Sequence, residues 1–261
     1  MTNFQYDQEY ASDYQLTVCS FSDSGGVENA PGGSEFSADQ IKITGTDEFA
    51  IITSDYASAL LFTFQACKID ANHSPAEISA EEFSKINRWV NRKESHKFKI
   101  DSAGYEHIYF MGRFNIQAVK IKGILYGIEF TFISDYPYGF MDEITNTYSG
   151  KEFMVYNHSD ETGDIYPYTV IKCLESGDLR IVNSMDSEEF ELKNCSVNEI
   201  ITVDNKHRVI TSSDSNHDLN EDFNFNYIKL CNTYGERRNN YTSSFNIEME
   251  IKYSPIRKVG I

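Results

Sequence analysis

The sequence predicts a mostly β chain with a single helix, divided into two domains. Aromatic residues make up 14% of the 261 positions, mainly 17 Tyr and 18 Phe, and such side chains favour pleated, half-buried strands. Only one segment has the periodicity of a helix. In the second half, short apolar runs recur about every 8–12 residues between turn residues, a spacing typical of a β-sandwich or jelly roll.

The first half of the chain alternates between strand-like and turn-like segments. The segment 59–68 shows the alternation most clearly, and it has one wholly apolar face that we expect to point into a core. That face consists of Leu60, Phe62, Phe64 and Ala66. We also expect Gly112, Gly123 and Gly127 to mark a bulge, a turn and a close backbone approach. The strands predicted here are 14–21, 41–44, 48–53, 59–68, 97–101, 107–119 and 123–134.

The predicted helix covers residues 80–92. Ser79 stands at the N-cap and Glu82 three residues later, which is the pattern of a capping box. Ile78 and Phe83 flank this cap as a hydrophobic staple. Apolar residues then recur at helical spacing and form one stripe that we expect to be buried. That stripe consists of Phe83, Ile86, Trp89 and Val90.

The turn cluster at 135–140 closes a first domain, and the polar stretch 141–150 is interpreted as the crossing to the second. We therefore predict domains over 1–145 and 146–261, whose last segment either stays in the second domain or returns to the first. The loop 22–39 is long for a compact domain, which favours a functional role or ordering by a partner. No helix is expected beyond about residue 92. The strands predicted in the second domain are 152–156, 166–174, 178–183, 187–193, 198–203, 206–211, 223–231 and 243–253.

The charge balance disfavours two classes of partner. A chain with a net charge of −17 gains no free energy from the release of counterions when it binds DNA. An anionic membrane surface repels such a chain as well. No apolar run approaches 18 residues, and the first residues have no signal core. A basic island lies at 85–99, which is either a solvated face or a seam that meets an acidic neighbour. The five Cys show no paired spacing and indicate a reducing compartment without disulfides.

No segment matches a complete motif for catalysis or metal binding. Ser24 stands in a Ser/Gly loop that begins too early in the chain for a trypsin-like order of residues. The alternation of Asp214, Asn216 and Asp218 lacks the Gly and the bidentate Glu that a calcium loop needs. The turn around His158 is interpreted as solvated surface. We therefore predict no catalytic residue, no cofactor, no metal ligand and no enzymatic activity.

The order of these segments resembles one known family. The segments LLFTFQACK (60–68), the capped helix 78–94, GYEHIYFMGRF (104–114) and the strand pair ending in SDYPYGF (134–140) carry the resemblance in the first half. The second half adds IYPYTVIK, GDLRIVN, VNEIITVDNKHRVI and FNIEMEIKYSP. The chain resembles the distal tail proteins of long-tailed phages, prophages and phage-tail-like particles. It departs from them at TYGERRNNYTSS (233–244), where the family tends to have a shorter turn.

The resemblance implies a structural part of a tail tip or baseplate. The first domain would form a hexameric ring that joins the tail tube to the tip and adhesion proteins, and the second would be a galectin-like β-sandwich. Implied partners are further copies of the chain, the tail tube protein, a tail-tip protein and, as a further candidate, a receptor-binding protein. The implied location is the particle tail, after synthesis in the host cytoplasm. Candidate interface residues are Arg88, Trp89, Arg92, Arg113, Tyr136 and Phe140.

Two other functions stay open at this point. A carbohydrate-binding module is suggested by four tyrosines of the second domain that we expect to be exposed, since the faces of sugars stack on aromatic rings; ordinary packing within strands is the alternative. These are Tyr166, Tyr168, Tyr234 and Tyr241. A hydrolase of cell-wall polymers would need two carboxylates that face each other across a cleft, and sequence alone does not identify such a pair.

Overall fold

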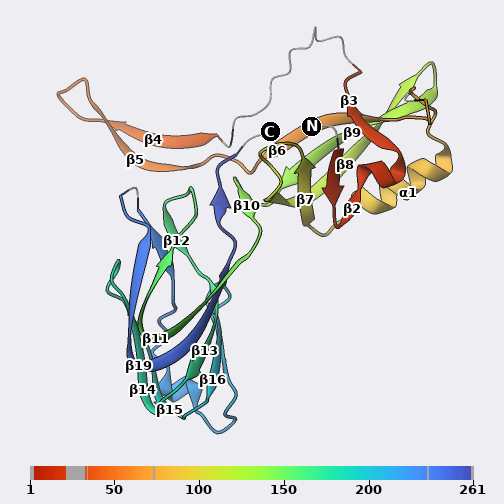
Figure 1. The fold of residues 1–261 in the computed structure, drawn as a ribbon. Helices are drawn as coiled ribbons and strands as arrows, with labels where there is room; N and C mark the ends of the chain where they lie inside the picture. Colours follow the sequence, from red (N-terminus) through yellow and green to blue (C-terminus); the bar gives the residue numbers. More distant parts are fainter. Residues whose placement is uncertain (1–2, 22–32, 34, 73, 234, 260–261) are drawn as a thin grey trace. The chain divides into compact units, whose positions relative to one another are not determined.

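The computed structural model describes residues 3–21, 33, 35–72, 74–233 and 235–259. The chain forms two compact units, one over Met1–Met141 together with Arg257–Ile261 and the other over Asp142–Ile256 (Figure 1). The last residues thus belong to the first unit. Among the described residues, no helix has the length and apolar character needed to cross a membrane.

One large antiparallel sheet dominates the first unit. Its strands follow the order β2-β1-β7-β8-β9-β6-β3, and β10 pairs with β8 and with β20. A separate hairpin, β4–β5, forms its own two-stranded sheet. The elements are β1 (Asn3–Tyr6), β2 (Glu9–Tyr10), the 3₁₀ turn η1 (Ala11–Tyr14), β3 (Leu16–Cys19), β4 (Phe36–Lys42), β5 (Phe49–Tyr56), β6 (Leu61–Lys68), α1 (Ala80–Val90), β7 (His96–Asp101), β8 (Ile108–Ile121), β9 (Ile124–Ser134), β10 (Gly139–Met141) and β20 (Ile256–Arg257).

Aromatic rings fill the core of the first unit. Phe4 on β1 packs edge-on against Phe130, with ring centroids 5.3 Å apart, and stacks on Trp89 at 5.7 Å. Trp89 also stacks on Tyr14, and its indole nitrogen donates to the Tyr6 carbonyl at 2.9 Å. Such offset and edge-to-face pairs add to the free energy gained from area burial. The helix is therefore attached to the sheet through one side chain that both packs and hydrogen-bonds.

The helix begins as its sequence predicts. The Ser79 hydroxyl accepts from the Glu82 amide, and the Glu82 carboxylate accepts from the Ser79 amide. Ile86, Trp89 and Val90 are buried, which confirms the predicted stripe. The predicted inward face of β6 is also confirmed, because Leu60, Phe62 and Ala66 are buried and Phe64 is half-buried; the first of these lies just before the strand.

Two glycines allow the central strands to pack closely. A Cβ added at Gly112 would lie 2.2 Å from the Ile133 carbonyl oxygen on the neighbouring strand. A Cβ at Gly127 would lie 2.3 Å from the Phe21 ring. Gly123 has a φ of +88° in the turn between β8 and β9. The turn expected at Gly123 and the close approach expected at Gly127 are thus both present. The bulge expected at Gly112 is wrong, because Gly112 pairs in register with Ser134, and the register shift between β8 and β9 lies between Val119 and Lys120. Gly112 is instead a second close approach.

A β-sandwich makes up the second unit. Its main sheet runs in the order β15-β14-β19-β13-β16-β17, with β11 also paired to β19, and β12 pairs with β18 separately. The elements are β11 (Ile144–Tyr156), β12 (Gly163–Ile165), β13 (Tyr168–Cys173), β14 (Gly177–Asn183), β15 (Glu189–Cys195), β16 (Ile200–Asp204), β17 (Val209–Ser212), α2 (Leu219–Asp222), β18 (Leu230–Asn232) and β19 (Arg238–Tyr253).

The long strand β19 organises this unit. Its side chains alternate between exposed and buried from end to end, and Ile247, Met249 and Ile251 are fully buried. β19 pairs with β14 through its first half and with β13 through its second half, while β11 follows it along the other edge. One strand therefore contributes to the whole hydrophobic core of the unit.

The structure corrects four further sequence-based expectations. The stretch 141–150 is no crossing, because most of it lies in β11, where Thr and Tyr pair with β19 on a half-exposed face. Within 223–231 only Leu230 and Cys231 lie in a strand, and the preceding aromatics pack from irregular backbone. A single helical turn, α2, lies beyond residue 92. The strand predicted from residue 14 begins at Leu16, after a 3₁₀ turn.

We expect Gly112→Ala to destabilise the first unit. The added methyl group meets backbone that cannot rotate away, so the free energy of unfolding should fall by about 1–3 kcal/mol or more. Urea unfolding followed by Trp89 fluorescence reports on this unit, because Trp89 is the only Trp and lies in its core. Asn115→Ala, at an exposed position of β8, should change stability by no more than about 0.5 kcal/mol. Equal midpoints for the two variants would contradict the packing argument.

Candidate assembly surface

The hairpin β4–β5 exposes apolar side chains that no core covers. Phe36, Phe49 and Ile51 are each 60–62% exposed. The two strands pair only with each other (Figure 1), and an isolated two-stranded hairpin is marginally stable in water. Exposed apolar residues that adjoin one another in this way mark an interaction surface. Further exposed apolar residues on or next to the hairpin are Ile41, Ile43 and Ile52.

Register divides the hairpin into two unlike faces. Phe36 pairs with Tyr56, and beyond the bulge Gln40 pairs with Ile51 and Lys42 with Phe49. Since strand residues two apart share a face, these side chains form one largely apolar face. The opposite face carries the acids Asp39, Asp55 and Glu48 together with Ile41 and Ile43. The aromatic side chains are therefore gathered on one face, which a partner could cover, while the acids lie on the other.

The base of the hairpin is held by aromatic and cationic contacts. The Phe36 and Tyr56 rings stack with centroids 4.8 Å apart, and Tyr56 meets Tyr138 edge-on at 6.1 Å. The Lys258 ammonium lies 5.8 Å from the Phe36 ring centroid and 6.0 Å from that of Tyr56, within the range of a cation–π contact. The C-terminal segment thus helps to anchor the hairpin.

The helix residues predicted at an interface differ in their exposure. Arg88 is exposed and forms no ion pair with any described residue. Arg92 binds the Asp7 carboxylate and donates to the Trp89 carbonyl. Trp89 is only 3% exposed, so its ring offers almost no surface to a partner. Within the basic island, Lys85 pairs with Glu81 at 2.9 Å, which reduces the positive charge available to a neighbour.

The other three predicted interface residues lie near the end of the first unit. Arg113 on β8 is exposed and reaches Asp135 at 3.2 Å. Phe140 on β10 packs edge-on against Tyr136, with centroids 5.0 Å apart, and stacks on Tyr109 at 5.6 Å. These rings form a partly exposed aromatic cluster.

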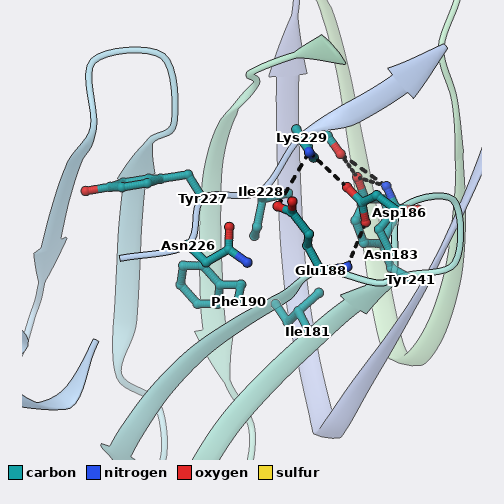
Figure 2. A pocket seen from close by; sticks show the side chains of 10 residues that line it. All are labelled: Ile181, Asn183, Asp186, Glu188, Phe190, Asn226, Tyr227, Ile228, Lys229 and Tyr241. Carbon is teal, nitrogen blue, oxygen red and sulfur yellow. Dashed lines mark hydrogen bonds and ion pairs between the residues drawn. The ribbon is translucent and has the colours of Figure 1, made fainter. Parts of the chain in front are cut away.

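A shallow pocket in the second unit contains facing carboxylates. Figure 2 shows Asp186 and Glu188 on either side of the Lys229 ammonium, which lies 3.4 Å from each. Asp164 binds the same ammonium at 3.2 Å. Burial lowers the pKa of Lys229, but the three carboxylates outweigh it and raise the pKa above the ordinary value. The hollow encloses about 230 Å³, a volume that includes open solvent.

The two facing carboxylates of this pocket contact the same ammonium group, that of Lys229, and Asp164 adds a third contact to it. The three carboxylates therefore act as ion-pair partners that hold Lys229 in place. Tyr241 supports the same network, since its hydroxyl donates to the Lys229 carbonyl at 2.7 Å.

The remaining candidates from the sequence are dispersed. Tyr241 is buried, Tyr168 is 41% exposed and Tyr166 is half-buried. Ser24 and Tyr234 lie outside the described residues. No three His, Cys, Asp or Glu side chains of the described chain gather as metal ligands, and Asp218 instead caps α2 by accepting from the Asn220 amide.

Sequence reasoning missed a buried ion pair in the second unit. His217 Nδ1 lies 2.6 Å from Glu199 Oε1, with side chains 2% and 0% exposed. Burial lowers the pKa of His217, but the Glu199 carboxylate outweighs it and raises the pKa. Burial raises the pKa of Glu199, but the Ser196 amide, the Ser212 hydroxyl and His217 outweigh it and lower the pKa. No local motif indicates this pair, because its members are 18 residues apart.

The surroundings of this pair are also polar. Asp222 on α2 lies 3.4 Å from His217 Nε2, an atom that has no hydrogen bond to any described residue. The Ser212 hydroxyl donates to Glu199, and the Cys195 thiol is close by. The pair therefore joins the segment after β17 to the turn between β15 and β16.

Comparisons with known proteins cover nearly the whole chain. A family model described as a phage tail protein N-terminal domain matches residues 1–136, and one described as a phage tail C-terminal domain matches residues 136–253. The chain is similar in fold to the crystal structure of the Dit (gp 19.1) protein of SPP1, a paradigm of the hub adsorption apparatus in phages that infect Gram-positive bacteria. The TM-score is 0.68 at 11% identity, over 97% of this chain and 99% of that chain. No curated protein matches the chain.

We expect His217→Gln to destabilise the second unit and to change its pH dependence. Removing one partner of a buried ion pair costs about 3–5 kcal/mol. Because the pKa of His217 is raised, the pair contributes fully below the ordinary His pKa of about 6.5 and is lost as pH rises through the raised value. Because the pKa of Glu199 is lowered, the acid-side loss begins only below the ordinary Glu value of about 4.3.

Calorimetric unfolding between acid and mildly alkaline pH measures this effect. The transition to follow is that of the second unit, which Trp89 fluorescence does not report because Trp89 lies in the first unit. The wild-type protein should lose stability on the alkaline side, and the variant should lack that loss. His207→Gln is the matched control, since His207 also pairs with a carboxylate but its side chain is 70% exposed. Parallel pH curves for wild type and His217→Gln would refute the role of the pair.

Proposed function

Because this chain belongs to a family of phage tail proteins, we propose that six copies form a ring at the distal end of a phage or phage-like tail. In this proposal the ring joins the tail tube to the tip and adhesion proteins. The first unit forms the ring wall, and the β-sandwich of the second unit serves as a scaffold. The role is structural and non-catalytic.

The observation that carries this proposal is the hairpin β4–β5. Seven- and eight-residue strands at about 3.3 Å per residue give it a reach of roughly 25 Å, enough to cross to a neighbouring subunit. Its aromatic face needs a partner to leave water. Contact between unlike surfaces of successive copies generates a ring when the rotation closes. A hairpin on one copy and a different surface on the next would make such a contact.

Charge distribution supports a tail location. A net charge of −17 repels DNA that passes through a channel, so the DNA slides without adhering. Arg88, which has no partner among the described residues, remains available to an acidic neighbour such as a second copy or the tail tube protein. The exposed Arg113 and the cluster around Phe140 are further candidates for contact with tip or receptor-binding proteins. Synthesis in the host cytoplasm precedes assembly.

Replacing the apolar hairpin face with charge tests the proposal. We expect Phe49→Glu combined with Ile51→Glu to abolish ring formation, because each large apolar side chain contributes about 1.5–3 kcal/mol when buried. Wild-type protein should form six-fold rings in negative-stain electron microscopy, alone or mixed with tail tube and tip proteins. Light scattering gives the number of copies. The variant should remain a folded monomer with unchanged Trp89 fluorescence.

A matched control places the same changes elsewhere. Phe225→Glu combined with Val197→Glu also converts an aromatic and an aliphatic residue to acids, at positions 61% and 53% exposed in the second unit. This control should form rings as the wild type does. A wild-type chain that stays monomeric at all concentrations and yields no ring in any reconstituted tail would contradict the proposal, as would rings formed by the hairpin variant.

A further inference from the structure

The strand β11 is an open edge of the β-sandwich. It spans Ile144–Tyr156 and pairs with β19 along one side (Figure 1). No other segment of the described chain pairs with its opposite side. A free edge presents unpaired backbone N–H and C=O groups, which can pair with another strand. The open edge is therefore 13 residues long.

The other two edge strands of this sheet are protected. Along β15, Phe223 forms a bridge with Leu192, and the Asn224 amide donates to the Glu191 carbonyl at 3.1 Å. The edge strand β17 is only four residues long. Covering segments and short edge strands are common ways in which proteins block unwanted pairing. The uncovered edge of β11 thus differs from both.

The strand register shows which backbone groups of β11 are unpaired. The Leu174 amide donates to the Asn246 carbonyl, so the even-numbered residues in this half of β19 bond towards β13 and the odd-numbered ones towards β11. Because Tyr253 pairs with Ile144, the even-numbered residues in the first half of β11 bond to β19. The backbone groups that point away from β19 are those of Thr145, Thr147 and Ser149.

Part of the core is also left open at this edge. Ile144 and Tyr148 pack against the core of the second unit, yet both are only half-buried. They lie on the inner face of β11, whereas Thr145 and Thr147 are exposed on the outer face. A strand added beside β11 would cover the Ile144 side chain and the Tyr148 ring while it pairs with the free backbone groups.

The first half of the edge lacks the residues that usually block pairing. Residues 144–150, ITNTYSG, contain no charged residue and no proline, although both are typical of protected edges. The register shifts between Gly150 and Glu152, and Lys151 lies at this irregularity. Such a shift disrupts the ladder locally. The surface open to pairing is therefore limited to residues 144–149.

We propose that residues 144–149 of β11 accept an extended strand from a second protein of the tail. The strand places apolar side chains over Ile144 and Tyr148, and it alternates these with neutral polar side chains on the outer face. Glu248 and Glu250 on the outer face of β19 already pair with lysines, so this face favours neither a cationic nor an anionic strand.

A second copy of this chain does not suit the edge. Pairing between two identical edges is isologous, so it joins copies about a two-fold axis. It would link two rings that point in opposite directions, whereas the proposed ring has one end for the tail tube and another for the tip. The choice of a different protein as the occupant rests on the proposed function, but the open edge does not.

Fluorescence anisotropy with a labelled peptide tests the site. The probe is a capped nine-residue peptide in which threonine alternates with valine or isoleucine between terminal lysines. The receptor is the full chain with Phe49→Glu and Ile51→Glu, so that neither ring formation nor the aromatic face of the hairpin contributes. We expect saturable binding. Hydrogen–deuterium exchange of residues 144–149 should become slower when the peptide is bound.

Thr147→Pro in this receptor separates pairing from folding. The Thr147 N–H points away from β19, so proline removes a donor of the edge and no hydrogen bond of the sheet, and proline is tolerated at such positions. Thermal unfolding should be nearly unchanged. Peptide binding should weaken about tenfold or more, because the edge loses a hydrogen bond and the proline ring obstructs the incoming strand. Thr147→Val is the matched control, because it keeps the backbone donor.

A methylated peptide tests the same contact without any change to the protein. Methyl groups on two consecutive central backbone nitrogens remove one donor from each edge of the peptide, so its binding should also weaken about tenfold or more. Four results would overturn the proposal. These are no saturable binding, equal binding of the methylated peptide, equal binding by folded Thr147→Pro, and self-association of the receptor that Thr147→Pro abolishes. Absence of rings in the wild type would contradict the proposed function and leave this binding unaffected.

Discussion

Removal of apolar side chains from water is the constraint on which this structure depends, and the strands meet it by alternating inward and outward residues. In β19 the alternation holds over all 16 residues, and in the first unit it directs the rings of β1, β6, β8 and β9 into one core. The hairpin β4–β5 gathers Phe36, Phe49 and Ile51 on one face, and no core of the described residues covers them. Its apolar face is therefore the feature of the described chain that most requires a partner.

Ion pairs connect separate segments of the second unit. Lys229 is surrounded by three carboxylates, and His217 is buried against Glu199. Both contacts join segments that lie far apart in sequence and would otherwise end in loops. Arg208 is the exception, since its guanidinium lies against the rings of Tyr166 and Tyr227 and forms no ion pair with a described residue.

Local patterns predicted the regular elements well, because their physics is local. The capping box at Ser79 and Glu82, the buried stripe of α1 and the inward face of β6 all follow from residue spacing within a few turns. The wrong predictions concern segments whose secondary structure depends on the strand or core that they pack against. Residues 144–150 form part of β11 only because β19 is there to pair with them, and Phe223 and Tyr227 are buried without belonging to a strand.

The sequence by itself determined the fold class, the single substantial helix and the family resemblance. Composition, periodicity and the order of elements can all be read from the sequence without knowing which segments meet in space. Only the tertiary structure decided which side chains meet. His217 with Glu199, Lys229 with Asp164 and Asp186, and Arg208 between Tyr166 and Tyr227 are each brought together by strand pairing across many residues. The tertiary structure also decided that Trp89 is buried and Phe49 exposed, because the burial of an aromatic residue depends on which other residues pack against it.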